Sequence, residues 1–353
     1  MLKVRRGRRS RPASLRDVAA ATGVSVMTVS NALSGRGRIA DDTRRRIRQA
    51  ADELMYRPNR LVHAIRTGQS GTVGVVVNLS NSYTALLVRG IHNELARSGR
   101  LPILHFTGVD TGTAHDTNEL AHLHRLLDHR VDGIIFWPSD ETVPASYLHE
   151  VWDRGIPLVA VDRRLEKTNA DFSGTDDVAG GRLMMDHALA LGHRHIAHLA
   201  GDLRVSTFAE RLRGCRVQVG KRRDVSFQAI ECGLHDCRDR VLSLLRDSRR
   251  PTAILAASDL LAQQAYEALE DAGLRVGQDV SVIGFADLPE AQWLQPKLTT
   301  IRQDFELIGR NAARLILDRL TAGGKAGTIA RNLRIAPELV VRGSSAPPSL
   351  KHQ

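Results

Sequence analysis

The chain has 353 residues, 42% of them hydrophobic and 25% charged, with a formal net charge of +11. This composition excludes a disordered tail protein and provides apolar material for two or three cores. Its apolar runs are short, such as residues 73–77, and its basic start is not followed by an apolar segment, which excludes a membrane span and a secretory signal. We therefore expect a cytoplasmic protein with no membrane partner, in which three cysteines form no disulfide framework.

Positive charge is concentrated at the start of the chain. Residues 1–70 hold 16 Lys and Arg against five Asp and Glu, which accounts for the whole net charge of +11. Such asymmetry favours a nucleic-acid-binding head on a neutral body, because cations that replace counterions on phosphates drive association. A solvated basic tail is the alternative that charge alone leaves open.

Residues 15–33 predict two short helices joined by a tight turn. Ser14 and Asp17 can form a capping box at the first helix, Gly23 suits a positive φ at its end, and Ser25 can cap the second helix. Apolar side chains fall where two steeply crossing helices would touch: Ala19, Val24, Val29 and Leu33. This spacing is typical of a helix-turn-helix, with an ordinary helical hairpin as the alternative.

Residues 41–56 predict a third helix with an acidic first turn, arginines on one side and an apolar stripe on the other. The stripe comprises Ile47, Ala50, Ala51 and Leu54. In the following segment, Pro58 and Asn59 signal a helix start and Gly68 a stop, but so short a helix is unstable alone in water. We therefore expect it to become ordered only against a partner.

From residue 71 onward, short apolar runs alternate with helical segments such as residues 84–98 and 259–272. Repeated strand-helix units predict parallel sheets with helices on both faces. We expect a first sheet over about residues 71–162 and a second over about 173–298, after which the motif LTTIRQD returns the chain to the first unit. Two such sheets joined by crossing strands form a hinge, with a ligand cleft at the carboxyl ends of the strands.

A series of motifs, in this order and spacing, resembles the LacI/GalR family of bacterial transcription regulators. The motifs are SLRDVAAATGVSVMTVSNALSG, DDTRRRIRQAADELMYRPN, IRTGQSGTVGVVV, VDGIIF, IPLVAVDRR, LGHRHIAHLAG, AILAASDLLA, DVSVIGF and LTTIRQD, and the likeness covers roughly residues 14–342. The resemblance implies an all-α helix-turn-helix head and an α/β periplasmic-binding-protein-like (type I) body of two doubly wound parallel-sheet subdomains. It also implies a homodimer that binds a double-stranded DNA operator and senses a small-molecule effector.

The resemblance sets the predicted domain boundaries. These are a basic extension at 1–13, a helix-turn-helix domain at 14–58, a hinge helix at 59–70, an effector-binding and dimerisation domain at 71–342 and a tail at 343–353. Within the body, the first subdomain would comprise about 71–162 and 301–329, and the second about 163–300 and 330–342. The tail has no heptad repeat, which argues against a tetramerising coiled coil. The arginine-rich extension either follows the DNA backbone or is disordered.

In the family the second helix lies in the major groove, which places Val26, Met27 and Asn31 at base edges. Asn31 can pair with adenine through two hydrogen bonds, whereas the other two side chains offer only apolar contact. Many relatives carry Arg at the position of Asn31, so the resemblance does not imply an operator sequence. Three residues are candidate DNA-backbone contacts, with plain helix-surface positions as the alternative: Ser25, Thr28 and Ser30.

The hinge helix resembles the element that enters the minor groove from each half of a dimer, with Ile65 as its apolar wedge. Two wedges at the dyad would unstack one central step and bend the duplex, so we expect a pseudo-palindromic operator centred on a pyrimidine-purine step. The alternative is that Ile65 packs against its twin.

The resemblance also implies an effector site. Its predicted residues are Tyr83, Ser139, Arg163, Arg211, Ser258, Asp259 and Asp287. Tyr83 would offer a stacking surface and Arg211 would hydrogen-bond ligand hydroxyls or a carboxylate. Ala286 departs from the pattern, because many sugar-binding relatives have an acid there, and Leu234 stands where an aromatic can stack on the ligand. A sugar or sugar derivative is the leading effector, and a degenerate pocket in a constitutive repressor is the alternative.

No catalytic motif accompanies these features. The sequence lacks GxGxxG after a first strand, Walker A, GxSxG and HExxH motifs, so we expect no enzyme and no cofactor. Cys232, His235 and Cys237 lack a second ligand pair, so we expect no metal. A transporter's solute-binding protein would need a signal peptide and no basic head, and a sugar-metabolising enzyme would need a catalytic base and a phosphate cradle. The predicted function is therefore repression by a ligand-modulated dimer, with the sign of the ligand's effect left open.

Overall fold

The computed structural model describes residues 11–35, 37–57, 68–79, 82–107, 119–138, 145–165, 168–220, 222–247, 249–323 and 329–349. The chain divides into two compact units, Met1–Ser70 and Gly71–Gln353, which we call the head and the body. Most of the expected hinge helix, including the wedge residue Ile65, lies outside the described residues, as do residues 1–10 of the basic extension.

The head is built from three helices, which are α1 (Leu15–Thr22), α2 (Val26–Leu33) and α3 (Asp41–Glu53). The carboxylate of Asp17 accepts hydrogen bonds from the Ser14 N–H at 2.7 Å and the Ser14 hydroxyl at 2.6 Å. Gly23 ends α1 at a φ of 69°, and the Ser25 hydroxyl oxygen accepts from the Thr28 N–H at 3.1 Å. The predicted caps of both helices are confirmed.

The core of the head consists of large apolar residues separated by alanines. Its fully buried large members are Val18, Val29 and Ile47, and the alanines at 19, 32 and 51 let the three helices approach closely. The prediction for Leu54 is wrong, because α3 ends at Glu53 and leaves Leu54 37% exposed. Met55 adopts a φ of 49° immediately afterwards, which turns the chain out of the helix.

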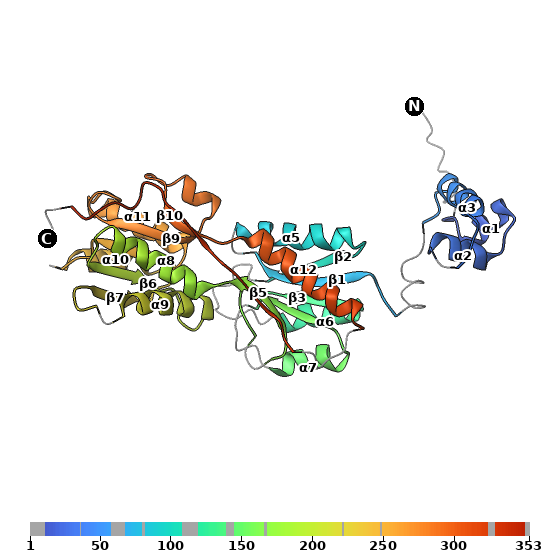
Figure 1. Cartoon of the computed structure of the whole chain (residues 1–353), viewed down its shortest axis with the longest axis horizontal. Helices are drawn as coiled ribbons and strands as arrows, with labels where there is room; N and C mark the ends of the chain where they lie inside the picture. Colours follow the sequence, from blue (N-terminus) through green and yellow to red (C-terminus); the bar gives the residue numbers. More distant parts are fainter. Residues whose placement is uncertain are drawn as a thin grey trace, which may run out of the picture. The chain divides into compact units, whose positions relative to one another are not determined.

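The body contains two six-stranded sheets (Figure 1). The first has the order β11-β5-β4-β3-β1-β2 and the second β12-β10-β9-β8-β6-β7, and only β10 and β12 pair antiparallel. The strands of the first sheet are β1 (Thr72–Asn78), β2 (Leu101–Thr107), β3 (Gly133–Phe136), β4 (Leu158–Val161), β5 (Asp171–Thr175) and β11 (Asn332–Ile335). Those of the second are β6 (His195–Leu199), β7 (Ser226–Ile230), β8 (Ala253–Ala256), β9 (Ser281–Ala286), β10 (Thr299–Arg302) and β12 (Glu338–Val340).

Helices pack on both faces of each sheet, so each sheet separates two apolar cores. The first subdomain has α5 (Tyr83–Arg97), α6 (Glu119–Asp128), α7 (Ala145–Asp153) and α12 (Phe305–Thr321). The second has α8 (Asp177–Ala190), α9 (Ser206–Val219), α10 (Cys237–Leu245), α11 (Asp259–Asp271) and the short η1 (Pro289–Gln292). The predicted helical head and two-sheet α/β body are confirmed. Among the described helices, none is long and apolar enough to cross a membrane.

The structure corrects the predicted division of strands between the sheets. Strands β5 and β11 belong to the first sheet, where β5 pairs with both β4 and β11, although residues 163–300 and 330–342 were assigned to the second subdomain. Strand β10 belongs to the second sheet, although residues 301–302 were assigned to the first subdomain. These strands are short and mix polar with apolar residues, so their own sequences do not show which sheet they join. The chain therefore crosses between subdomains three times, after β5, after β10 and after β11.

The segment that follows Arg342 also differs from the expected tail. Ser344 is fully buried, its hydroxyl donates to the Val282 carbonyl at 2.6 Å, and its oxygen accepts from the Thr299 N–H at 2.7 Å. Two residues further on, the Ala346 N–H donates to the Ser281 hydroxyl at 3.0 Å. The described residues 343–349 are therefore packed as part of the second subdomain.

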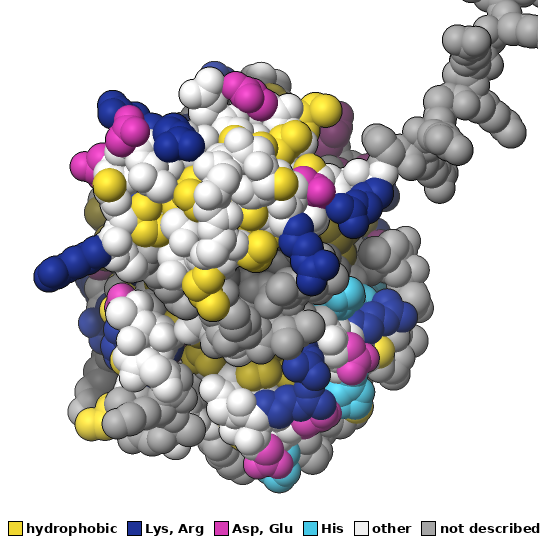
Figure 2. Space-filling view, turned by 90° about the vertical axis from the view of Figure 1, so that its right-hand side faces the viewer, with side chains coloured by type: hydrophobic (Ala, Val, Ile, Leu, Met, Phe, Trp, Pro, Cys, Tyr) yellow, Lys and Arg dark blue, Asp and Glu magenta, His cyan; other side chains and the backbone are white. Residues whose placement is uncertain are grey.

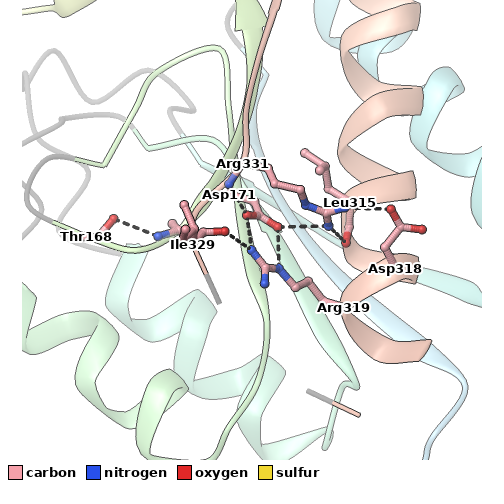
Figure 3. Close-up of polar contacts among 8 residues, drawn as sticks. Thr168, Asp171, Leu315, Asp318, Arg319, Ile329 and Arg331 are labelled. Carbon is pink, nitrogen blue, oxygen red and sulfur yellow. Dashed lines mark hydrogen bonds and ion pairs between the residues drawn. The ribbon is translucent and has the colours of Figure 1, made fainter. Parts of the chain in front are cut away.

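Asp171, the first residue of β5, links the end of α12 to the residue that precedes β11 (Figure 3). Arg319, near the end of α12, donates to both carboxylate oxygens at 2.6 and 2.8 Å, and the Arg331 N–H, just before β11, donates at 2.8 Å. Burial raises the pKa of Asp171, but the hydrogen bonds from Arg319 and Arg331 outweigh it and leave the pKa below its usual value.

We expect Asp171→Asn to lower the free energy of unfolding by about 3 kcal/mol, because it removes a buried carboxylate, 1% exposed, that is the charged partner of Arg319. The control is Asp318→Asn, since Asp318 pairs with Arg331 at 2.9 Å but is 64% exposed, and its loss should cost less than about 1 kcal/mol. Urea unfolding measures both. The Asp171 contribution is lost as the pH falls through its lowered folded-state pKa, so the deficit of the variant should shrink in acid. Equal losses in the two variants would contradict this assignment.

Candidate functional site

The head presents the start of α2 to its surroundings. Val26 and Met27, its first two residues, are 41% and 66% exposed. Asn31, one turn later, is half-buried, and its side chain lies beside Gly37 in the connection to α3. Exposed apolar side chains next to an amide suit contact with base edges, where thymine methyls and adenine can be recognised.

The three candidate backbone contacts lie on or directly before the same helix. Ser25 is exposed and caps α2, and its hydroxyl lies 2.9 Å from that of Thr28, while Ser30 is half-buried. Several arginines of the head are exposed, among them Arg38, Arg45 and Arg48. Figure 2 shows basic side chains projecting from the visible surface, with acidic side chains beside several of them and hydrophobic and uncharged atoms between. Charged groups around a neutral reading surface are what a phosphate backbone requires on both sides of a groove.

In the body, Arg211 on α9 lies where the two subdomains join. It is only 5% exposed, and its Nε donates to Asp177 Oδ1 at 2.7 Å. One terminal nitrogen donates to the Ala257 carbonyl at 2.7 Å, and the other to Gln303 Oε1 at 3.4 Å. Gln303 donates in turn to the Thr175 hydroxyl at 2.8 Å. Arg211 is therefore tied to the first crossing through Asp177 and to the second through Gln303.

The guanidinium of Arg211 is also held between aromatic rings. Its carbon lies 3.8 Å from the centre of the Phe285 ring and 5.6 Å from that of Phe208. Stacking of a cation on an aromatic face adds to its hydrogen bonds and fixes its plane. Of the five N–H groups of a guanidinium, three have partners among the described residues, so two remain to donate to a ligand.

Two buried carboxylates surround this arginine. Burial raises the pKa of Asp177 to about 7, while Arg211 opposes the rise. Asp162, directly after β4, is 9% exposed, and burial also raises its pKa against the pull of Arg163 and Arg211. The site thus holds the acceptors Asp162 and Asp177 beside the donor Arg211, and its opposite charges largely cancel.

An aromatic cluster lies at the start of α5, in an apolar core of the body. Tyr83 stacks on Phe305 with ring centres 4.3 Å apart and planes 10° apart, and its ring centre lies 5.3 Å from that of Trp137. Ala286 and Leu288, which follow β9 of the second sheet, belong to the same apolar cluster. Trp137 and Phe305 are buried, at 2% and 3% exposed, so the half-buried Tyr83 is the member of this aromatic cluster that a ligand could reach.

The other predicted effector residues have different surroundings. Ser258 caps α11 by accepting from the Leu261 N–H at 3.2 Å, and Arg163 is half-buried beside Asp162. Asp259 is 4% exposed and accepts from the Thr300 hydroxyl at 2.6 Å and the Leu288 N–H at 2.8 Å. Asp287 accepts from Arg302 at 2.7 Å and Arg342 at 2.6 Å. Both carboxylates thus have internal partners, which favours a structural role for each; Ser139 lies outside the described residues.

Sequence reasoning missed the residues that complete this site. They are Asp162, Thr175, Asp177, Phe285 and Gln303. The sequence carries a signal for most of them. Four of the five are the last residue of a strand or follow a strand within two residues, and ligand sites of parallel sheets form at these carboxyl ends.

Within the described residues, no group of three or more His, Cys, Asp or Glu side chains is arranged to hold a metal ion.

Comparison with known proteins gives separate matches for the head and for the body. Residues 14–59 match the model of bacterial regulatory proteins of the lacI family, and residues 185–345 match a periplasmic binding protein-like domain. The HTH-type transcriptional repressor PurR of Vibrio atlanticus is 30% identical over 87% of this chain and 92% of its own. The PurR repressor of Erwinia tasmaniensis is 30% identical over 95% of this chain and 97% of its own.

Solved structures show a similar arrangement. The lac repressor dimer bound to operator and the anti-inducer ONPF is 28% identical, with a TM-score of 0.81 over 95% of this chain and 100% of its own. The transcriptional regulator CelR, in its complex with cellobiose, is 28% identical, with a TM-score of 0.67 over 94% of this chain and 99% of its own.

The internal partners of Asp259 lead to a stability prediction. We expect Asp259→Ala to lower the free energy of unfolding by about 3 kcal/mol, because it leaves the Thr300 hydroxyl and the buried Leu288 N–H without an acceptor. Ser258→Ala, which removes only the helix cap next to it, should cost about 1 kcal/mol. Thermal and urea unfolding compare the two variants. A loss at Asp259 no larger than that at Ser258 would favour the effector contact inferred from the sequence.

Proposed function

Because the chain belongs to the LacI family of bacterial regulatory proteins, we propose that it is a sequence-specific repressor that binds operator DNA as a homodimer in the cytoplasm, under the control of a small molecule. The observation that carries this proposal is the head, in which a capped helix presents Val26 and Met27 to its surroundings within the unit that holds all the excess positive charge. Such a unit binds phosphate through its charge and reads bases through α2.

A second copy of the chain is the partner that the body fits best. Strand β2 is an edge strand of the first sheet, and it exposes Leu101, Leu104 and Phe106 at 49%, 37% and 38%. Large apolar side chains on an open sheet edge favour burial against another molecule. Two heads in one dimer would read two half-sites, so we propose a pseudo-palindromic operator. The proposed wedge at Ile65 would act at its centre.

The effector that the site favours is neutral and hydroxylated. Arg211 retains two N–H donors, and Asp162 and Asp177 supply acceptors, so hydroxyl groups can be hydrogen-bonded from both sides. The half-buried ring of Tyr83, which is backed by Phe305, suits the apolar face of a sugar ring. The cellobiose complex of the similar regulator CelR supports a carbohydrate or a derivative of one.

A repressor that has lost its effector is the second candidate. Ala286 offers no acceptor at the end of β9, and Leu234 is 53% exposed where a ligand-stacking aromatic is expected from the family pattern. A thermal-shift screen of sugars and nucleosides separates the candidates, because a ligand that binds only the folded state raises the melting temperature.

Selection of binding sites from random double-stranded DNA tests the proposal directly. We expect purified protein to recover a two-fold symmetric motif with a pyrimidine-purine centre, and the recovery to fall as salt is raised. Recovery of random sequences, with and without the compounds found by thermal shift, would contradict sequence-specific repression.

The role proposed for Asn31 predicts a loss of sequence preference. We expect Asn31→Ala to weaken operator binding by about 1 to 3 kcal/mol and to relax the preference at one base in each half-site. Binding to an unrelated duplex should not change. Ser30→Ala serves as the control, because loss of a backbone contact weakens binding to all sequences alike. Uniform weakening by Asn31→Ala would show that Asn31 contacts only the DNA backbone.

The exposed edge of β2 predicts an effect on assembly. We expect Phe106→Glu to shift the chain from dimer to monomer in analytical ultracentrifugation, because the dimer would have to bury a charge. Operator affinity should fall with it, since two linked heads bind far more tightly than one. Trp293→Glu, at an aromatic outside this strand that is 73% exposed, is the comparison. An unchanged dimer in the Phe106 variant would remove β2 from the interface.

A further inference from the structure

We propose that Glu210, next to Arg211 on α9, is a positioning residue for the effector response, because it links α9 to the strands that join the subdomains. This inference rests on the proposed function, in which a ligand contacts Arg211. Its physical basis is that two consecutive side chains of one helix have partners at all three crossings of the chain.

Glu210 is an acceptor for arginines that belong to the first subdomain. One of its carboxylate oxygens accepts from Arg164 at 2.6 Å, and the other accepts from Arg334 at 2.9 Å. Arg334 lies in β11, directly before the third crossing, and Arg164 lies in the connection between β4 and β5. The Glu210 side chain is 14% exposed, and those of Arg334 and Arg164 are 26% and 40% exposed. Partial burial makes these pairs stronger than surface ion pairs.

Arg211 contacts the other two crossings. Asp177, its partner at 2.7 Å, follows the crossing after β5, and Gln303, its partner at 3.4 Å, lies in the crossing after β10. A ligand that draws the guanidinium of Arg211 toward itself would therefore pull on both crossings and on α9. Any displacement of α9 would stretch the Glu210 pairs.

Helix α9 cannot shift independently of α8, because the two helices touch through glycines. A Cβ on Gly181 would lie 2.0 Å from the Arg211 carbonyl oxygen, and a Cβ on Gly214 would lie 2.3 Å from the Val178 carbonyl oxygen. The pair α8–α9 thus moves as one body with respect to the first sheet. Glu210 is the side chain of this body that is bonded to β11, so it determines how far the subdomains can rotate against each other.

The test measures the distance between the subdomains in the full-length chain. Spin labels are attached to cysteines introduced at the exposed Asp128, on α6, and Ala190, on α8, and the labelled chain is diluted with unlabelled chain to suppress signals between copies. The native cysteines at 215, 232 and 237 are buried. We expect Glu210→Gln to broaden the distance distribution by about twofold, because the amide keeps the shape but not the charge.

A matched control removes an ion pair inside one subdomain. Asp271 on α11 accepts from Arg238 on α10 at 2.7 Å, and Asp271→Asn should leave the distribution unchanged. Arg334→Gln, which removes the partner instead of Glu210, should reproduce the broadening and covers the case that Glu210→Gln fails to fold. Distributions in folded Glu210→Gln or Arg334→Gln that match the unmodified chain would overturn the proposal.

The same proteins are then titrated with the operator recovered by selection and with the sugars found by thermal shift. Glu210→Gln should bind those sugars with unchanged affinity but reduce their effect on operator affinity by at least about fivefold, as loss of a coupling element requires. Loss of sugar binding itself would show that Glu210 shapes the site and would overturn the positioning role. Failure of the unmodified chain to select any operator would refute the proposed function, whereas the distance measurement would still decide the role of Glu210.

Discussion

The body depends on keeping one buried positive charge satisfied. A guanidinium that is 5% exposed would cost several kcal/mol without partners, and no single neighbouring segment provides them all. Arg211 obtains them from Asp177, Ala257 and Gln303, which lie 34, 46 and 92 residues away along the chain. The second subdomain and two of the crossings must therefore be in place together before the charge is satisfied. The site at the junction is thus also a condition for the stability of the fold.

This requirement bears on the kind of effector that the proposed site at Arg211 would accept. A ligand that brings its own charge adds to a site where burial already raises the pKa of Asp162 and of Asp177. A neutral polyol can accept from Arg211 and donate to the carboxylates without adding a buried charge. Binding would then change the hydrogen bonds of Arg211 to Asp177 and Gln303 at the crossings. Those bonds would in turn strengthen or weaken ligand binding, depending on whether the head is bound to DNA. Such coupling is reciprocal, because both ligands act on one equilibrium.

The sequence predicts well those features that depend on residues close together along the chain. The Ser14–Asp17 box, the Gly23 stop and the Ser25 cap of the head each involve residues at most three or four positions apart, and all appear as expected. The buried runs of β1, β3 and β9 were likewise evident, since strands covered on both faces must be apolar throughout. Helix and strand identity in the body follows from these local patterns.

The features that the sequence could not predict depend on residues far apart along the chain. Strands DFSGT and NLRI carry no pattern that selects a sheet, and β11 obtains its place from pairing with β5, more than 150 residues earlier. Asp259 was expected to face a ligand, but a Thr300 hydroxyl 41 residues away occupies one of its oxygens. The buried Ser344 shows the same limit, because nothing in RGSSAPP indicates that it binds Val282 and Thr299.

The end of β9 shows why a nearby acid cannot replace the one that is missing at Ala286. Ala286 and Asp287 have φ values of 135° and 57°, so the chain turns sharply at the point where the family pattern places its acceptor. This turn directs Asp287 to Arg302 and Arg342, whose two ion pairs occupy both carboxylate oxygens. Freeing Asp287 for a ligand would leave Arg342, whose side chain is 13% exposed, without its charged partner and Arg302 with only Glu338, at a cost greater than one ligand hydrogen bond returns. In the proposed effector site the acceptors are therefore Asp162, which follows β4, and Asp177 at the start of α8, rather than Asp287.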